Sequence, residues 1–441
     1  MHIPLLILAA TAFGADSIDS ILQDQWNAQS ITPAEICSDD EFLRRISLDL
    51  IGRIPTRKEL LAFRTTPDRS AKIDELLDSK AFARSWSEVW TATLNGYSNA
   101  FESDREVLRV WLERAFDNKW SYDRIAAELI NARGTSALDG PVNFLVRHPE
   151  DPAITVCRLF LGVRLDCARC HDHPFDRWQR EDFERMNRFF EAVRVEEVGE
   201  GNIRISNRRV DADDDDRPRF LTGARPRTSQ WRLELALFVT NSKPFSRAFA
   251  NRLWYYLLGR GIVHPVDDFN QQNPAASPRL LAFLAEQARA SKFDLRHMIR
   301  LICNSRAYQL SSLYEMRGGK AESLFAFRKL KPLTPEQAYD SVASALNLKT
   351  DELQRREFIE RAVGEMLDED FSNTWEYRET VQVLMTRLTT TLPVPTAKVT
   401  ELYERILTRE PTSLEKKVCR GKAPRDLVFA LVNSNEFFFN H

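Results

Sequence analysis

The sequence predicts a mainly α-helical protein of two helical domains joined by a charged, mostly irregular linker. Apolar residues recur at four-residue spacing, for example at Phe42, Ile46 and Leu50, and this period places them on one face of a helix. Strand-like alternation is confined to short pieces such as NIRIS at 202–206. A chain of 441 residues is longer than one hydrophobic core usually covers, so more than one domain is expected.

The N-terminus predicts a secretory signal over residues 1–14. Residues 3–13 form an apolar run that is too short to span a bilayer. Small residues at Ala10, Ala12 and Gly14 give the spacing of a cleavage site. The segment lacks the Lys or Arg of a typical signal, and a buried N-terminal helix is the alternative. No later segment predicts a membrane span, so we expect export to the periplasm or the extracellular space.

The helical domains are expected at residues 15–193 and 229–441, with a smaller boundary near residue 318. The linker between them, residues 194–228, lacks helical periodicity and is dense in charge. Its acidic run at 211–216 lacks the ligand and glycine spacing of a calcium-binding loop, so we expect a solvated loop. Several helices have recognisable starting residues. These starts are Ser121, Ser277, Asp294, Thr334 and Thr412.

Composition and missing motifs argue against several function classes. The formal net charge is −2, which gives no basis for nucleic-acid binding. The chain has 15 glycines and contains no GxGxxG, GxxxxGK[ST] or GxSxG motif. Phosphate-binding loops and serine nucleophile elbows therefore have no support in the sequence.

The segment DCARCHDHPF, residues 166–175, contains two of the six cysteines and two of the seven histidines. Cys167, Cys170 and His171 have the C-x-x-C-H spacing of c-type haem attachment. Two thiols one helical turn apart can bond the porphyrin edge, and the following histidine can become the proximal iron ligand. The sequence predicts haem c as the cofactor, with a pocket wall formed by an apolar helix that runs directly into Cys167.

Other haem contacts have several candidates. Arg169 and Arg177 are candidates for neutralising the propionates. Met186 and Met298 are candidates for the sixth iron ligand, although methionine on a helical face is more often a core residue. A five-coordinate iron is the alternative.

Three other interpretations of the motif stay open. Cys167, Cys170, His171 and His173 would form a Cys₂His₂ zinc set, although zinc ligands usually come from two separated segments. A redox dithiol is the second, because the Cys-x-x-Cys spacing lowers a thiol pKa. The third is a reduced pair with a structural role. A secreted binding or scaffold protein with a structural metal site and no catalysis is the corresponding alternative function.

A second polar group lies in residues 251–274. His264 precedes the adjacent carboxylates Asp267 and Asp268, which could perform acid–base chemistry in an extracellular hydrolase. Adjacent carboxylates usually point in different directions, so a structural role is the main expectation. On that interpretation Gly259 ends a helix and one aspartate pairs with an arginine.

Four cysteines lie outside the motif, and their spacing defines no disulfide pairing. Cys157 and Cys303 occupy strongly apolar helical stretches, which predicts buried thiols rather than bridges. The other two are Cys37 and Cys419.

These stretches resemble a known pair of domains. VCRLFLGVRLDCARCHDHPFDRWQREDFERMNRFF resembles a secreted planctomycete cytochrome-c-like domain of unknown function. NRLWYYLLGRGIVHPVDDF and FDLRHMIRLICNSRAYQLSS resemble its partner, the planctomycete-specific C-terminal domain. Further similar segments are LRRISLDLIGRIPT at 43–56, RKLKPLTPEQ at 328–337 and LVNSNEFFFNH at 431–441.

The resemblance spans nearly the whole chain after its signal. It implies export, a mostly helical two-domain build and the motif from Cys167 to Phe175. The segment NPAASPRLL departs from the family's usual Asn-Pro-Pro-Ser-His-Pro pattern, so a histidine-based role for that loop is not expected. Family members often carry a further cytochrome c module that this chain lacks, so electron transfer would need a redox partner protein.

Aromatic residues gather in both predicted domains. Because aromatic side chains bury large areas and pack on one another, we expect the two clusters to face each other across an interface beside the motif. Domain interfaces are a common place for a ligand pocket. The clusters are Phe175, Trp178, Phe189 and Phe190 in the first domain and Trp254, Tyr255 and Tyr256 in the second.

Overall fold

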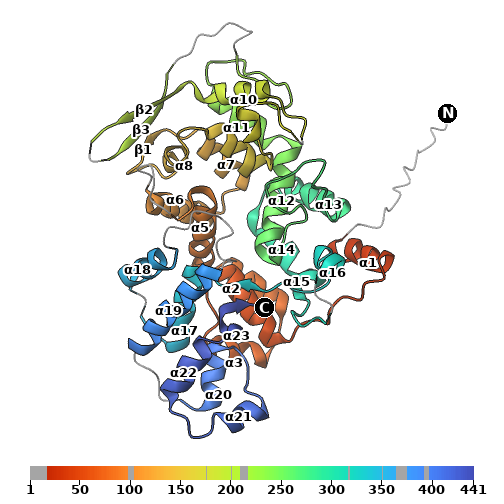
Figure 1. Ribbon diagram of the computed structural model, residues 1–441, viewed down its shortest axis with the longest axis vertical. Helices are drawn as coiled ribbons and strands as arrows, with labels where there is room; N and C mark the ends of the chain where they lie inside the picture. Colours follow the sequence, from red (N-terminus) through yellow and green to blue (C-terminus); the bar gives the residue numbers. More distant parts are fainter. Residues whose placement is uncertain are drawn as a thin grey trace, which may run out of the picture.

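The computed structural model is mainly α-helical, as the sequence predicts (Figure 1). The predicted signal at 1–14, the acidic run at 211–216 and Phe175 lie outside the described residues. None of the described helices combines the length and the apolar character that crossing a membrane requires. The structure describes residues 17–97, 104–174, 176–199, 201–208, 217–315, 318–349, 351–363, 375–391 and 397–441.

The buried side chains form two hydrophobic cores. The larger core draws its residues from 18–327 and therefore includes parts of both predicted domains. The smaller core draws its residues from 333–438, together with Leu48 and Ile54 of the N-terminal part. The break between the cores lies between residues 327 and 333, and the larger core contains residues from both sides of the predicted linker.

The N-terminal part of the larger core consists of short helices and a small sheet. Its α-helices are α1 (Ile18–Ala28), α2 (Asp39–Ile51), α3 (Arg57–Thr65), α4 (Arg69–Leu77), α5 (Lys80–Asn95), α6 (Arg105–Asp117), α7 (Tyr122–Ile130), α8 (Val142–Arg147), α9 (Pro152–Val156) and α10 (Arg180–Asn187). Its other helical elements are the short π-helix η2 (Cys157–Leu161) and the 3₁₀ turns η3 (Cys167–Arg169) and η4 (Arg188–Phe190).

A three-stranded antiparallel sheet includes the first part of the predicted linker. Strands β2 (Val193–Glu197) and β3 (Ile203–Asn207) pair with each other, and β1 (Gly134–Thr135) pairs with the other edge of β3. Ile203 and Ile205 alternate with exposed residues and are buried, which is the pattern of a half-buried strand. The strand predicted from NIRIS is confirmed. The hairpin occupies the first part of the predicted linker, and the described residues of the linker are otherwise irregular, in line with a mostly irregular linker.

The C-terminal part of the larger core packs directly on the N-terminal part. Helix α11 packs against α7, and α12 packs against η2, which explains why the two predicted domains share one core. The helices of this part are α11 (Trp231–Thr240), α12 (Lys243–Leu258), α13 (Pro278–Ala290), α14 (Leu295–Cys303), α15 (Arg306–Gln309) and α16 (Gly319–Ser323).

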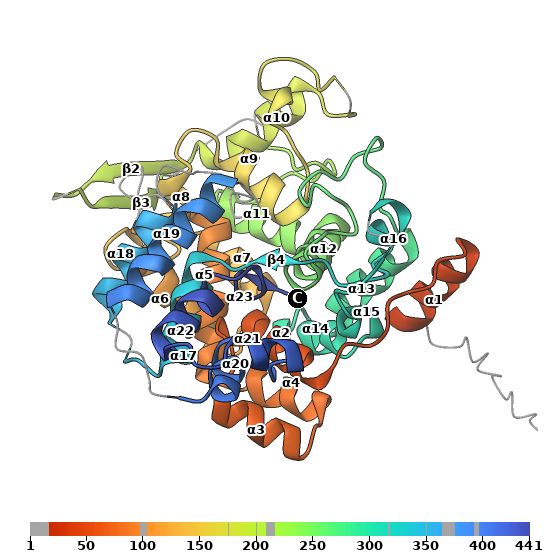
Figure 2. The same ribbon diagram turned by 60° about the horizontal axis from the view of Figure 1, so that its bottom comes forward.

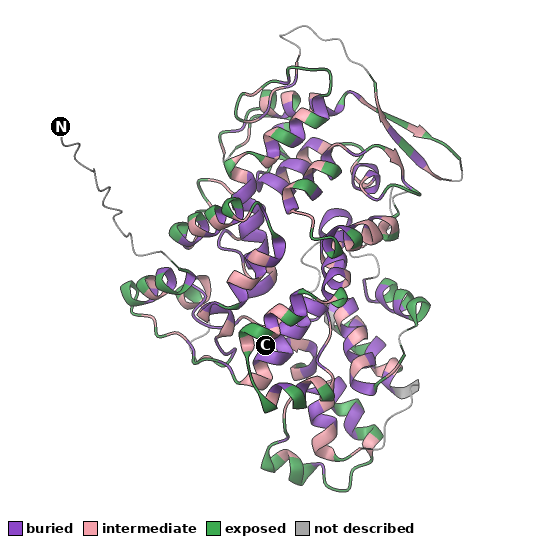
Figure 3. Ribbon diagram, turned by 180° about the vertical axis from the view of Figure 1, so that it is seen from behind, coloured by how far each residue is buried: buried purple, intermediate pink, exposed green. Residues whose placement is uncertain are grey.

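The smaller core is formed by the C-terminal helices, with α2 and α3 lying beside them (Figures 1 and 2). Figure 3 shows buried residues along the inner faces of these helices and exposed residues on their outer faces. The elements are β4 (Lys331–Pro332), α17 (Pro335–Leu346), α18 (Glu352–Val363), α19 (Trp375–Thr391), α20 (Val399–Ile406), α21 (Ser413–Val418), α22 (Pro424–Val432), α23 (Asn435–Phe438) and β5 (Phe439–Asn440), and β4 pairs antiparallel with β5.

The predicted helix starts agree with the structure. Ser277 and Asp294 cap α13 and α14 by accepting hydrogen bonds from backbone N–H groups. Thr334 and Thr412 form capping boxes at the starts of α17 and α21. Ser121 occupies the N-cap position of α7, where its side chain makes no capping hydrogen bond.

Candidate functional site

The apolar helix before the motif ends earlier than predicted. Helix α9 continues into the π-helix η2, which ends at Gly162. The φ of Gly162 is 67°, a left-handed conformation that suits glycine. The carbonyl oxygen of Gly162 accepts a hydrogen bond from the backbone N–H of Phe269 at 2.9 Å, and a Cβ at Gly162 would lie 2.4 Å from the Phe269 ring. The helix ends at Gly162 because of this close packing. A short non-helical segment therefore separates the helix from Cys167.

The motif itself forms one 3₁₀ turn on the surface. Cys167, Cys170 and His171 are exposed, and neither cysteine is in a disulfide. Ala168 is fully buried and anchors the turn. Arg169 forms an ion pair with Asp151 at 2.7 Å, which fixes the turn to the start of α9. Arg169, one of the two arginines predicted to neutralise the propionates, is thus already paired with a carboxylate.

Hydrogen bonds hold the loop that follows the turn. Nδ1 of His171 lies 2.8 Å from the carbonyl oxygen of Asp172. Because a carbonyl oxygen only accepts, Nδ1–H is the donor and Nε2 of the neutral ring keeps its lone pair. The backbone N–H of His173 donates to the carbonyl oxygen of Trp178 at 2.8 Å, and the N–H of Arg180 donates to the Asp172 carboxylate at 2.9 Å. These hydrogen bonds connect the described residues of the loop to one another.

The donor set of the motif suits haem attachment. Two exposed thiols lie one turn apart at Cys167 and Cys170, and Nε2 of His171 is available as a ligand. A metal-binding histidine typically has its other ring nitrogen bonded to a carbonyl or carboxylate, as His171 does. Among the described residues, His, Cys, Asp and Glu side chains form no group of three or more that could hold a metal ion. The four side chains of the zinc alternative, which include His173, are therefore not gathered.

The methionines considered as a sixth ligand are core residues. Met186 in α10 and Met298 in α14 are both fully buried within the larger core. The cysteines Cys157 and Cys303 are also fully buried, as predicted, and burial raises the pKa of both thiols. Cys37 and Cys419 are likewise buried and free of disulfides.

A cavity of about 260 Å³ adjoins the motif loop. Asp176, Arg177 and Trp178 line it from the loop, and residues from α12 and from the segment 263–275 line it from the other side. The motif loop therefore meets the second predicted domain at this cavity, but the prediction that the two aromatic clusters face each other there is wrong for the described residues, because Trp254, Tyr255 and Tyr256 do not line the cavity. Trp178 takes part, and Phe175 lies outside the described residues.

The other predicted aromatic residues pack elsewhere. Trp254 packs edge-on against Phe325 with ring centroids 5.0 Å apart. Phe189 packs edge-on against Phe238 at 6.3 Å. Trp254 therefore contacts a ring of its own predicted domain, whereas Phe189 contacts a ring of α11 in the other predicted domain. Tyr256 contacts rings of α5, at Trp86 and Trp90.

The second polar group has the structural role that was expected. Asp267 forms a buried ion pair with Arg252 of α12, and the Asp268 carboxylate accepts a hydrogen bond from the Asn270 amide at 2.7 Å. The two carboxylates thus have separate partners. Gly259 ends α12 with a φ of 77°, as predicted. His264 stacks on the ring of Tyr255, with the centroids 6.2 Å apart.

A buried cluster around Asp49 escaped the sequence-based prediction. One carboxylate oxygen of Asp49 accepts from the Tyr308 hydroxyl at 2.9 Å and from Arg328 at 3.2 Å. The other oxygen accepts from Lys331 at 2.5 Å and from the Asn440 amide at 2.8 Å. Burial lowers the pKa of Lys331 to about 8. The segments at 43–56, 328–337 and 431–441 that carry the family resemblance meet at this cluster.

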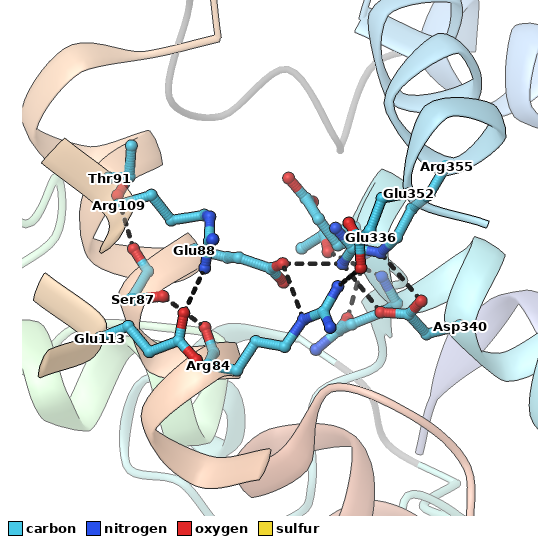
Figure 4. Close-up of polar contacts among 12 residues, drawn as sticks. Arg84, Ser87, Glu88, Thr91, Arg109, Glu113, Glu336, Asp340, Glu352 and Arg355 are labelled. Atoms are coloured by element: carbon cyan, nitrogen blue, oxygen red, sulfur yellow. Dashed lines mark hydrogen bonds and ion pairs between the residues drawn. The ribbon is translucent and has the colours of Figure 1, made fainter. Parts of the chain in front are cut away.

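A second network of charges joins the two cores (Figure 4). Arg355 of α18 binds Glu88 of α5 at 2.8 Å and Asp340 of α17 at 2.8 Å. Burial raises the pKa of Glu88 to about 7, although Arg355 opposes this shift. Nearby, Arg105 lies 3.5 Å from Glu336. A cavity of about 840 Å³ is lined by arginines and carboxylates of this network, so the network connects helices rather than presenting one sign of charge; the lining includes Glu88, Arg105, Glu336 and Arg355.

Comparison with known proteins identifies two domains. Residues 17–195 match the family model PSCyt2, described as a protein of unknown function (DUF1549). Residues 231–387 match the family model PSD1, also described as a protein of unknown function (DUF1553). No match to this chain is found among curated proteins or among solved structures. The chain therefore belongs to the proteins that carry a PSCyt2 domain followed by a PSD1 domain.

Proposed function

We propose that this chain is an exported protein that attaches haem c at Cys167 and Cys170 and uses it in electron transfer. The observation that carries the proposal is the geometry at His171, whose Nδ1–H donates to a backbone carbonyl at 2.8 Å and so directs the Nε2 lone pair outward. The two thiols beside it are exposed and outside disulfides, which thioether formation with porphyrin vinyl groups requires. A bound haem would supply one-electron redox chemistry.

The contacts around the motif support proposed haem-binding roles for particular side chains. His171 would be the axial ligand, held in its tautomer by the Asp172 carbonyl oxygen. Arg177 is the remaining candidate for a propionate, because Arg169 is paired with Asp151. Because the motif is exposed, a haem attached there would be within reach of a redox partner protein.

The test is production of the full chain in the bacterial periplasm together with the haem-attachment machinery. We expect a Soret band that survives acid–acetone extraction and a mass increase of one haem per chain. The Cys167→Ser and Cys170→Ser variants should each lose one thioether bond. Absence of covalently attached haem in the wild-type protein would overturn the proposal.

Two histidine variants separate haem from the structural zinc alternative. His171→Gln should change the axial ligation seen in the optical spectrum, while His173→Gln should leave it unchanged. In the zinc alternative, a secreted binding or scaffold protein holds the metal with both histidines. Both variants would then lose about one zinc per chain by elemental analysis.

Export is a separate part of the proposal. The apolar run at 3–13 is followed by small residues, and this pattern supports cleavage near residue 14. N-terminal sequencing of the periplasmic protein should begin at or just after this position. Retention of the uncleaved chain in the cytoplasm would contradict export.

A further inference from the structure

The cavity beside the motif loop is lined by apolar side chains and by cationic groups. Leu161, Val163 and Phe269 supply apolar lining, and Arg177 and Arg247 are the arginines that line it. The cavity lies between residues matched to PSCyt2 and residues matched to PSD1, a location typical of ligand sites. Its volume of about 260 Å³ restricts it to small ligands.

Both arginines are held in place by aromatic rings rather than by carboxylates. The guanidinium of Arg177 lies 4.5 Å from the centroid of the Trp178 ring, and that of Arg247 lies 5.3 Å from the centroid of the Phe269 ring. Within the part of the chain that the structure describes, neither arginine forms an ion pair. Asp176 also lines the cavity, and its carboxylate accepts from the backbone N–H of Arg177 at 2.7 Å. Two guanidinium groups are thus available to an anion.

Trp178 provides an independent indication of a ligand. Its side chain lines the cavity and is 6% exposed. The indole Nε1–H is buried and has no hydrogen-bond acceptor among the described residues. Because a buried N–H donor without an acceptor is unfavourable, an acceptor atom bound in the cavity would satisfy it.

We propose that this cavity binds a small organic carboxylate with an apolar body. The guanidinium groups of Arg177 and Arg247 match a carboxylate through paired N–H donors, and the Trp178 indole donates to the same anion. The apolar body lies against Leu161 and Phe269. This site does not depend on haem attachment, because its lining excludes Cys167, Cys170 and His171. Burial also lowers the pKa of Arg247, a shift that a bound anion would reverse.

A carboxylate could come from a free acid or from the propionates of a haem attached at the motif. Two forms of the full chain distinguish these sources: the haem-loaded wild type and the haem-free Cys167→Ser/Cys170→Ser variant. Binding of added carboxylate to both forms assigns the site to a free acid. Binding to the haem-free form alone assigns it to a propionate.

The direct test is calorimetric titration of the haem-free chain with acetate, butanoate, hexanoate and benzoate. We expect saturable binding of the acids with an apolar body, and at least tenfold weaker binding of the neutral analogue benzamide. Arg177→Gln and Arg247→Gln should each weaken binding about tenfold. Trp178→Phe should weaken it by a smaller factor, since the ring is retained and only the N–H is lost.

Arg180→Gln is the matched control. Arg180 follows the loop as the first residue of α10, pairs with Glu184 at 2.9 Å and does not line the cavity, so the affinity of this variant should equal that of the wild type. Unchanged melting temperatures of the ligand-free variants show that folding is intact. No saturable binding of any of the four acids, or equal affinities in Arg177→Gln, Arg247→Gln and Arg180→Gln, would overturn the proposal.

Discussion

The motif loop and the Asp49 cluster are both rich in polar side chains but occupy opposite environments. In the loop, Cys167, Cys170 and His171 are exposed and make few contacts beyond their neighbours. In the cluster, Asp49 is buried, and its carboxylate accepts four hydrogen bonds from residues distant in sequence. The difference shows that the loop is accessible to molecules outside the chain, whereas the cluster connects distant parts of the chain to one another.

The energetics of burial explain why the cluster must be complete. A buried carboxylate is costly unless charged and neutral donors replace its water, and removing one partner exposes that cost. The donors at Asp49 come from α15, β4, β5 and the segment before β4, so the cluster fixes the N-terminal, central and C-terminal parts of the chain to one another. An exposed loop has no such requirement, and its polar groups stay hydrated.

The largest expected effect is on thiol reactivity. In the haem-free folded chain, a maleimide should label Cys167 and Cys170 at the rate of exposed thiols. Cys157 and Cys303 are 0% exposed and should react at least about 10³-fold more slowly, because labelling requires opening of the core. Mass spectrometry of labelled peptides over time gives the rates. Equal rates for all four cysteines would remove the contrast between loop and core.

A large effect on stability is expected for Asp49→Ala. Removing this carboxylate leaves the buried Arg328 and the half-buried Lys331 without their anion, which should lower the free energy of unfolding by about 3–5 kcal/mol. Asp172→Ala in the loop is the matched control, since it loses one exposed hydrogen bond to a backbone N–H, and it should cost less than about 1 kcal/mol. Urea denaturation of both variants provides the comparison. Similar losses in the two variants would show that burial does not distinguish the two regions.

The sequence predicted the helical class, the helix starts and a strand at 202–206, which the structure has at 203–207, because these depend on local periodicity and capping. It also predicted that Cys157 and Cys303 are buried, from the apolar residues beside them. It did not predict that one core would span both domains, since that depends on packing between α7 and α11 and between η2 and α12. The Asp49 cluster has the same cause, because its donors are separated by more than 250 residues from Asp49 and no local pattern connects them.

For the candidate site, local spacing was sufficient for the motif and insufficient for its surroundings. Cys167, Cys170 and His171 are adjacent in sequence, so their grouping could be predicted. The cavity at Trp178 and Arg247 depends on contacts between residues roughly 70 to 110 positions apart, including the close approach of Phe269 to Gly162. Such contacts come from the fold as a whole.

A smaller effect, dependent on pH, is expected from the network between the cores. The pKa of Glu88 is raised from 4.5 to about 7 in the folded chain, so the folded state holds this proton more tightly than the unfolded state. Its contribution to stability is present below about pH 4.5 and is lost as the pH rises through about 7. Glu88→Gln should therefore flatten the decline in unfolding free energy between pH 5 and 7.5 by about 2 kcal/mol.

The control for this prediction is Glu352→Gln in the same network. The Glu352 side chain is 66% exposed and pairs with Arg84 on the surface, so its removal should leave the pH dependence unchanged. Chemical denaturation of wild type and both variants at several pH values gives the slopes. A wild-type slope equal to that of Glu88→Gln would contradict the raised pKa.

The smallest effect is expected when both motif cysteines are replaced in the haem-free chain. Cys167 and Cys170 are exposed, so the double variant Cys167→Ser/Cys170→Ser should change the free energy of unfolding by less than about 0.5 kcal/mol. Cys303→Ser places a hydroxyl in an apolar core and should cost about 1–3 kcal/mol. A structural zinc site would reverse this order, because losing two thiolate ligands removes metal-binding energy from the folded state. Denaturation with and without a chelator therefore tests whether the loop is a reactive surface or a metal-stabilised part of the fold.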